Sequence, residues 1–148
     1  MRDMILRKIE KLEHEKQIRI LYAVESGSRA WGFASQDSDW DVRFIYIHHP
    51  DWYLQIEKVK DNMGEITPDN IDITGWELRK AFQLLVKSNT PFLEWLRSPI
   101  VYRQHSSVVD RIRELIPFYF DRRTCMNHYY NIAANSFAQY LSNGNMKL

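Results

Sequence analysis

Two aspartates separated by one residue, Asp39 and Asp41, follow a glycine–serine turn at Gly27–Ser28. On a β-strand, residues i and i+2 point to the same face, so the two carboxylates would lie side by side. Carboxylates this close repel each other unless a cation lies between them. Hard divalent cations that prefer oxygen ligands, Mg²⁺ above all, are their natural partners. The spacing therefore predicts a metal site.

Asp72 supplies a third candidate carboxylate. It lies in Ile71–Gly75, where apolar and polar residues alternate as is typical of a strand with one buried face. If this strand lies beside that of Asp41, the three carboxylates form one cluster. Such a cluster can hold two metal ions about 3.5–4 Å apart, which stabilise the attacking and leaving oxygens in phosphoryl transfer. Asp51 and Asp69 are alternatives by composition, and Asp69 is disfavoured because it lies in an expected loop.

The Gly27–Ser28 turn is suited to bind phosphate. A glycine between a strand and a helix lets the backbone approach a ligand closely, and the first N–H groups of the helix favour an anion. The Ser28 hydroxyl adds a donor, and Arg29 could add positive charge near the same phosphates. Arg43 alternates onto the carboxylate face, where it would either neutralise the aspartates or contact phosphate. Glu25, just before the turn, is interpreted as the polar end of a strand.

Apolar strands and amphipathic helices must position these residues. Strands are expected at Ile18–Val24, Asp41–Ile47 and Ile71–Gly75, with a short one at Ile100–Tyr102. Helices are expected at Asp3–Glu15, Trp76–Val86, Pro91–Arg97, Ser107–Leu115 and Arg122–Leu141, the fourth of them stopping before Pro117. The polar segment 60–70 is expected to be a loop or hairpin turn, and 52–57 fits either a short helix or an edge strand.

The predicted fold class is α/β (α+β). We expect a small mixed sheet, flanking helices on one side of it, and a helical C-terminal extension. A boundary near Pro117 would divide a core at residues 1–117 from a helical region at 118–148.

Length and composition limit the function classes. The 148 residues are 45% hydrophobic, enough for one core, and a net charge of +1 gives no overall field that would attract nucleic acid or an anionic membrane. Cys125 is the only cysteine, which excludes an internal disulfide and a cysteine-based zinc finger. No apolar run approaches the roughly 20 residues that span a bilayer, and the N-terminus lacks the apolar core of a signal peptide. The sequence therefore predicts a cytoplasmic protein without a membrane partner.

The order Gly27–Ser28, Gly32 and Ser38-Asp39-Trp40-Asp41 resembles the signature of the DNA polymerase β-like nucleotidyltransferase superfamily. The resemblance covers roughly Ile20 to Tyr102 and points to a branch of predicted nucleotidyltransferases that includes RNA-ligase-associated bacterial and phage members. The segments that carry this narrower resemblance are Asp41-Val-Arg-Phe-Ile-Tyr46, Ile71-Asp-Ile-Thr-Gly-Trp76, Lys87-Ser-Asn89 and Glu94-Trp-Leu-Arg-Ser-Pro-Ile-Val-Tyr102.

The resemblance implies transfer of a nucleoside monophosphate from an NTP to an acceptor hydroxyl, with release of pyrophosphate. Two Mg²⁺ ions would assist, and Mn²⁺ could substitute for them. It implies three catalytic, metal-binding carboxylates: Asp39, Asp41 and Asp72. It also implies a nucleotide-binding set: Gly27, Ser28, Arg29 and Lys87. Members of the superfamily usually continue into a larger helical domain, of which 118–148 would be the start.

Several alternatives stay open at the level of sequence. The NTP could be ATP, CTP, GTP or UTP, the acceptor could be an RNA end, a protein or a small molecule, and a homodimer is compatible with the sequence. The chain could instead be a nucleotide- or RNA-binding regulator that keeps the fold without turnover. It could also be a minimal toxin–antitoxin type enzyme that adenylylates a helical partner protein, although the segments at Trp76 and Glu94–Trp95 match that branch less well.

Overall fold

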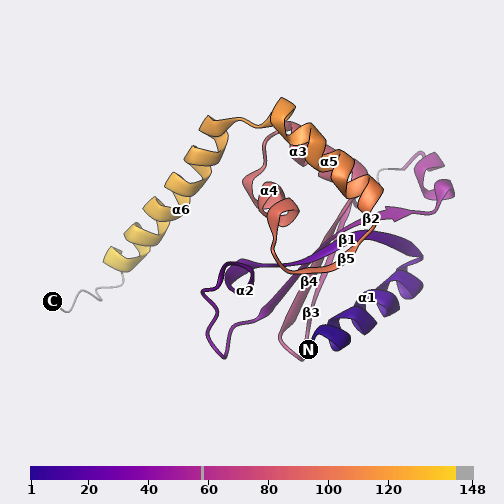
Figure 1. Ribbon diagram of the computed structural model, residues 1–148, viewed down its shortest axis with the longest axis horizontal. Coiled ribbons are helices and arrows are strands. Elements are labelled where there is room, and N and C mark those ends of the chain that lie inside the picture. Colours follow the sequence, from indigo (N-terminus) through magenta and orange to yellow (C-terminus); the bar gives the residue numbers. More distant parts are fainter. Residues whose placement is uncertain (58, 143–148) are drawn as a thin grey trace.

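The computed structural model describes residues 1–57 and 59–142, and its centre is a five-stranded sheet in the order β3–β4–β2–β1–β5 (Figure 1). The strands are β1 Ile18–Ser26, β2 Trp40–His48, β3 Asn62–Thr67, β4 Ile71–Glu77 and β5 Val101–Gln104. β2 and β4 are parallel, whereas β1–β2, β1–β5 and β3–β4 are antiparallel. The sheet is therefore mixed, as predicted.

The helices are α1 Arg2–Lys16, α2 Gly27–Trp31, α3 Leu78–Val86, α4 Thr90–Arg97, α5 Ser106–Tyr119 and α6 Arg122–Ser142, with a 3₁₀ turn η1 at Pro50–Leu54. The turn η1 shows that the ambiguous segment near residue 52 begins as a short helix. α5 continues past Pro117, although the sequence pattern predicted an end before it. The N–H of Phe120 still donates to the carbonyl of Ile116 (2.8 Å), so the last turn closes in spite of the missing proline N–H.

Helices cover both faces of the sheet, whereas the sequence predicted them on one side. α1 packs Ile5 and Ile9 onto one face, against Ile20 and Phe44. α3, α4 and α5 cover the other face with a separate cluster of residues: Leu85, Phe92, Leu96, Val109 and Ile112 against Tyr22, Val24 and Ile45. The central strands are buried on both faces, so each face needs a cover. Amphipathic periodicity identifies a covering helix without telling which face it covers.

β3 occupies most of the segment expected to be a loop or hairpin turn. Its residues are mostly exposed, and it pairs only with β4 at one edge of the sheet. An edge strand whose two faces are exposed to solvent needs no alternation of apolar and polar residues. For this reason the sequence pattern did not predict β3 as a strand. The turn that follows β3 ends at Asn70, which adopts the left-handed φ of +56°.

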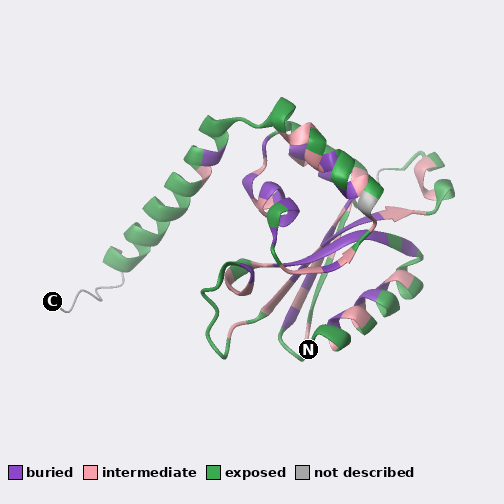
Figure 2. Cartoon of the chain, viewed as in Figure 1, coloured by how far each residue is buried: buried purple, intermediate pink, exposed green. Residues whose placement is uncertain are grey.

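α6 extends away from the sheet and its covering helices (Figure 1). Apart from buried Cys125 and half-buried His128, its residues up to Leu141 are exposed, as the green ribbon in Figure 2 shows. This helix is the predicted helical C-terminal segment, and its expected end at Asn143–Gly144 lies outside the described residues. Within the described ranges, no helix combines the length and apolarity that crossing a bilayer requires.

Candidate active site

The parallel pairing of β2 with β4 brings together two of the predicted carboxylates. In its register Asp41 lies directly opposite Asp72. Asp72 points away from the face on which its neighbours Ile71 and Ile73 are buried against α1. Both side chains are partly buried, with 28% of Asp41 and 31% of Asp72 exposed. The expectation that the strand of Asp72 lies beside that of Asp41 is therefore confirmed.

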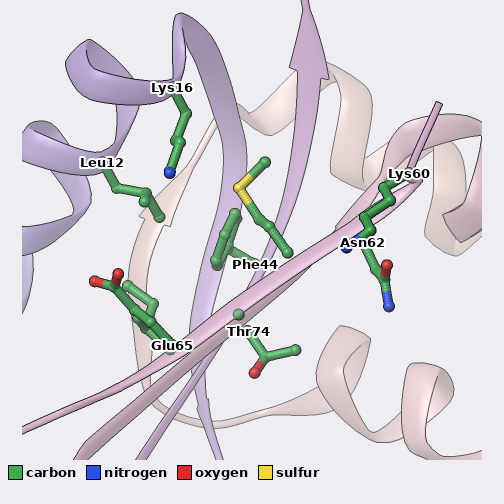
Figure 3. A pocket seen from close by; sticks show the side chains of 10 residues that line it. Leu12, Lys16, Phe44, Lys60, Asn62, Glu65 and Thr74 are labelled. Atoms are coloured by element: carbon green, nitrogen blue, oxygen red, sulfur yellow. The ribbon is translucent and has the colours of Figure 1, made fainter.

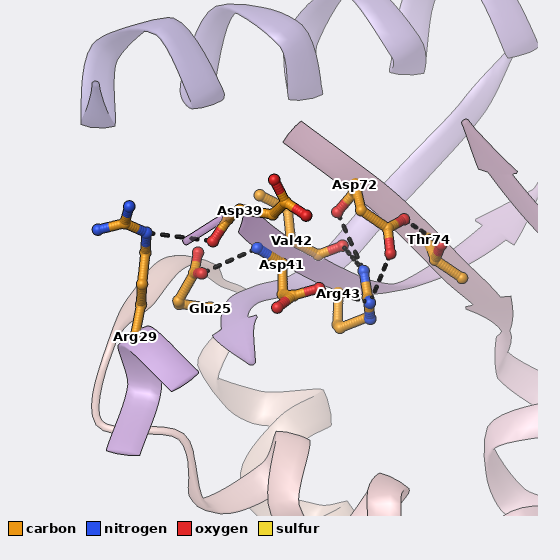
Figure 4. Close-up of polar contacts among 8 residues, drawn as sticks. All are labelled: Glu25, Arg29, Asp39, Asp41, Val42, Arg43, Asp72 and Thr74. Carbon is orange, nitrogen blue, oxygen red and sulfur yellow. Dashed lines mark hydrogen bonds and ion pairs between the residues drawn. The ribbon is translucent and has the colours of Figure 1, made fainter. Parts of the chain in front are cut away.

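Arg43 bridges these two carboxylates. Its Nη2 donates to Asp41 Oδ1 (2.9 Å) and to Asp72 Oδ2 (2.7 Å), and its Nη1 donates to the Asp72 carbonyl (3.0 Å). The hydroxyl of Thr74 donates to the other oxygen of Asp72 at 3.0 Å. Figure 4 shows the guanidinium beside the carboxylate of Asp72, with Asp41 next to it. Of the two roles left open for Arg43, neutralisation of the aspartates is the one that these contacts support.

Asp39 comes immediately before β2 and is exposed, so the expectation that Asp39 and Asp41 lie on the same strand is wrong. Its backbone is held by Arg29, whose guanidinium donates to the carbonyls of Ser38 (2.5 Å) and Asp39 (3.1 Å). The same guanidinium lies over the ring of Trp40, 4.1 Å from its centre. In this structure Arg29 thus anchors the loop that carries Asp39.

Gly27 places the glycine–serine turn directly against Asp41. Ser26, the last residue of β1, pairs with Asp41, so the turn begins at the same edge of the sheet as the carboxylates. Gly27 has a φ of +64°, and a Cβ there would lie 2.3 Å from Asp41 Oδ2. Only glycine fits both the conformation and the space. Ser28 follows in the first turn of α2.

Glu25 is a part of the site that sequence reasoning missed. It is fully buried, and its carboxylate accepts hydrogen bonds from the backbone N–H of Asp41 (2.9 Å) and the hydroxyl of Tyr102 (2.6 Å). Its own backbone is fixed by the N–H bond to the Ile100 carbonyl (2.9 Å) and by the Ser98 hydroxyl, which donates to the Glu25 carbonyl (2.5 Å). A charged residue at the end of a strand buried on both faces was the signal that could have identified it.

The electrostatics of this edge favour a bound cation. Burial raises the pKa of the Asp41 carboxyl, Arg43 opposes this rise, and the nearby carboxylates of Asp72 and Asp39 add to it. Burial also raises the pKa of Glu25, and the hydrogen bonds from Tyr102 and Asp41 only partly offset this effect. Negative charge is therefore crowded around Asp41.

The donor set fits a hard divalent cation in part. Two carboxylate oxygens already converge on one positively charged nitrogen of Arg43, which shows that a cation can be shared at that position. Across the residues that the structure describes, no three histidine, cysteine, aspartate or glutamate side chains converge as ligands of one metal ion. Asp41 and Asp72 therefore form the preassembled pair, and Asp39 lies beside it on the loop.

Within the described residues, no hydrogen bond or ion pair joins Lys87 to this cluster. Lys87 is exposed at the end of α3, next to Ser88, whose hydroxyl accepts from the N–H of Asp121 (2.9 Å). A cavity of about 510 Å³ lies between α1 and the β3–β4 edge (Figure 3). Its lining includes Lys16, Phe44, Met63 and Thr74 but none of the three predicted carboxylates.

Comparison with known proteins places these residues in a family context. A family model described as "RNA repair pathway DNA polymerase beta family" matches residues 1–148. The uncharacterized protein YcgL of Bacillus subtilis (strain 168) is 44% identical over 148 residues, which cover 100% of this chain and 57% of that relative. The chain thus spans a little over half the length of this curated relative.

Proposed function

The chain belongs to the RNA repair pathway DNA polymerase beta family, and we propose that it is a nucleotidyltransferase that uses an NTP. A bond would form between the acceptor hydroxyl oxygen and the α-phosphorus, and the bond from that phosphorus to the pyrophosphate oxygen would break. The observation that carries the proposal is the opposed pair Asp41 and Asp72, with the Gly27 turn in contact with Asp41.

The carboxylates would hold divalent cations, Mg²⁺ or, as a substitute, Mn²⁺. Asp39 and Asp41 would contribute to both ions, and Asp72 would bind one of them and help to activate the acceptor hydroxyl. When bound, such ions stabilise the attacking and leaving oxygens of an in-line displacement. Glu25 would act as a positioning residue, because it holds the backbone N–H of Asp41.

The triphosphate would lie at Gly27 and Ser28, because Gly27 lies so close to the Asp41 carboxylate that an added Cβ would be 2.3 Å from Asp41 Oδ2. Arg29 is a weaker candidate for phosphate, because its guanidinium already binds the loop of Asp39. Lys87 remains a proposed nucleotide contact, and no interaction among the described residues joins it to the carboxylates.

The proposal is tested by calorimetric titration of ATP, CTP, GTP and UTP, each with and without Mg²⁺. Wild type should bind at least one NTP in a metal-dependent manner, and Asp39→Asn/Asp41→Asn should abolish that binding. Asp51→Asn is the matched control, since Asp51 is an exposed aspartate outside the cluster. A screen of RNA ends, proteins and small molecules for pyrophosphate release then identifies the acceptor. Equal NTP binding by wild type and the double variant would disprove the proposal.

A second candidate is a nucleotide-binding regulator without turnover. The position of Arg43 favours it, because a protein cation already joins the two carboxylates that would otherwise share a metal ion. For this candidate we expect NTP binding that does not depend on Mg²⁺ and no pyrophosphate release with any acceptor. Metal-dependent release with any acceptor would exclude it.

A further inference from the structure

We propose that a groove between α2, α4 and the start of α6 binds the nucleobase of the NTP, an inference that rests on the proposed function. This groove, called the Trp31 groove below, is lined by Trp31 from α2, by Leu93, Glu94 and Arg97 from α4, and by Phe120 and Tyr129 from the α5–α6 region. Its volume of about 360 Å³ falls within the range of roughly 300–1,000 Å³ typical of small-molecule sites.

The groove begins next to the turn that would hold the triphosphate. Trp31 ends the short helix α2 and follows Ser28 by one helical turn, so the two residues are neighbours on its surface. The wall of the groove that α4 forms also lies near the Gly27–Ser28 turn. Ser98, directly after Arg97 at the end of α4, donates to the carbonyl of Glu25 at 2.5 Å. A nucleotide with its phosphates at Gly27 therefore has the groove beside it.

The apolar walls suit a flat aromatic ring. Trp31 and Tyr129 come from different elements, and each keeps about half of its side chain exposed, 43% and 51%. Leu93 and Phe120 add apolar surface between them. Aromatic side chains with exposed faces are the usual stacking platforms for nucleobases, and stacking does not depend strongly on which base is present.

The polar groups give the groove a preference among bases. Glu94 accepts a hydrogen bond from the hydroxyl of Tyr129 at 2.6 Å through one of its two carboxylate oxygens. A carboxylate accepts from the exocyclic amino group that adenine, cytosine and guanine carry, whereas uracil lacks this group and offers only its ring N3–H. Thr90 also lines the groove, and its buried hydroxyl has no hydrogen-bond partner in the described part of the chain. We therefore expect UTP to be the poorest ligand.

The test compares ATP, UTP and inorganic tripolyphosphate, all with Mg²⁺, by calorimetry on wild type and variants of intact fold. Trp31→Ala should weaken ATP binding by about tenfold and leave tripolyphosphate binding unchanged, because only ATP carries a base that can stack. Phe33→Ala is the matched control: Phe33 lies two residues further along, is 84% exposed and does not line the groove. Glu94→Ala should remove the preference for ATP over UTP, and Glu94→Gln, which keeps a carbonyl acceptor, should retain it.

Failure of this inference is distinguishable from failure of the proposed function. If ATP and tripolyphosphate bind equally, or if Trp31→Ala behaves like Phe33→Ala, the base does not lie in the Trp31 groove, while the triphosphate site stands. If neither ligand binds, or if Asp41→Asn leaves ATP binding intact, the proposed function fails and this inference fails with it. If the Trp31 groove instead binds an apolar segment of protein, ATP and tripolyphosphate should bind equally.

Discussion

Arg43 explains how two aspartates can face each other at partly buried positions. The opposed carboxylates repel, and the guanidinium supplies a hydrogen bond and a compensating charge to each. A divalent cation at the same place would compete with Arg43 for the same oxygens. Folding stability and the proposed binding of a divalent cation would therefore be coupled through one side chain.

Arg43→Met should lower the free energy of unfolding by about 2 kcal/mol in the absence of divalent cations, since two charged hydrogen-bond acceptors lose their donor. It should also enlarge the gain in Tm on adding Mg²⁺, because the carboxylates then have no competing partner. Thermal unfolding with and without Mg²⁺ measures both effects. Arg7→Met, at an exposed position of α1, is the control and should change neither value. A smaller gain from Mg²⁺ in Arg43→Met than in wild type would contradict this account.

Glu25 should make the stability of the metal-free protein depend on pH. Because burial raises its pKa in the folded state, folding favours the protonated form. Its contribution is therefore fully present below its unfolded pKa of about 4.3 and is lost as pH rises through the raised folded pKa. Glu25→Gln should remove this loss, so the variant gains stability relative to wild type across that interval. Urea unfolding at a series of pH values measures the difference, and parallel profiles of the two proteins would refute the prediction.

At the scale of elements, the junction of β1 with α2 depends on close contact between Gly27 and Asp41. Gly27→Ala should cost about 1–2 kcal/mol for the left-handed conformation, and it also displaces the carboxylate of Asp41. If the chain is the proposed nucleotidyltransferase, a displacement of this kind should lower its transfer activity by about a hundredfold. Gly32→Ala isolates the first effect, because Gly32 has a φ of +80° and nothing within 4 Å of the added Cβ. Equal activity of the two variants would show that the contact with Asp41 is unimportant.

The same elements show what the sequence could reveal. Alternation along two apolar segments predicted strands that present Asp41 and Asp72, and the structure contains both strands. Alternation could not give the parallel register that sets these residues opposite each other, because pairing partners are chosen by the whole sheet. Alternation also could not decide whether Arg43 neutralises the aspartates or contacts phosphate, since both roles place its side chain on the same face. Glu25 was missed because its contacts are tertiary: its carboxylate accepts from the N–H of Asp41 on the next strand and from the hydroxyl of Tyr102, far along the chain.

For the whole molecule, α6 carries a series of exposed apolar side chains. Tyr130, Phe137 and Tyr140 are 72%, 66% and 73% exposed. Large exposed apolar patches mark sites of interaction, and these side chains are the candidates for such a site on α6. The relative from Bacillus subtilis is longer than this chain, which matches 57% of it.

The 148-residue chain should therefore self-associate as its concentration rises. Phe137→Ser/Tyr140→Ser should lower the apparent mass, measured by light scattering after size-exclusion chromatography. Asn131→Ser/Asn135→Ser, at exposed polar positions of the same helix, should leave it unchanged. A wild-type chain that stays monomeric throughout would show that α6 does not drive association.

The parallel pairing of β2 with β4 has a consequence for how the protein folds. β1 and β2 pair locally, whereas β4 joins β2 only after η1 and β3 have been passed. A slip of one residue in this pairing would set Ile71 or Ile73 opposite Asp41 and turn Asp72 to the wrong face. A divalent cation shared by Asp41 and Asp72 would bind only chains that had reached the correct register. Such an ion would therefore stabilise the correctly paired sheet over chains whose strands are out of register.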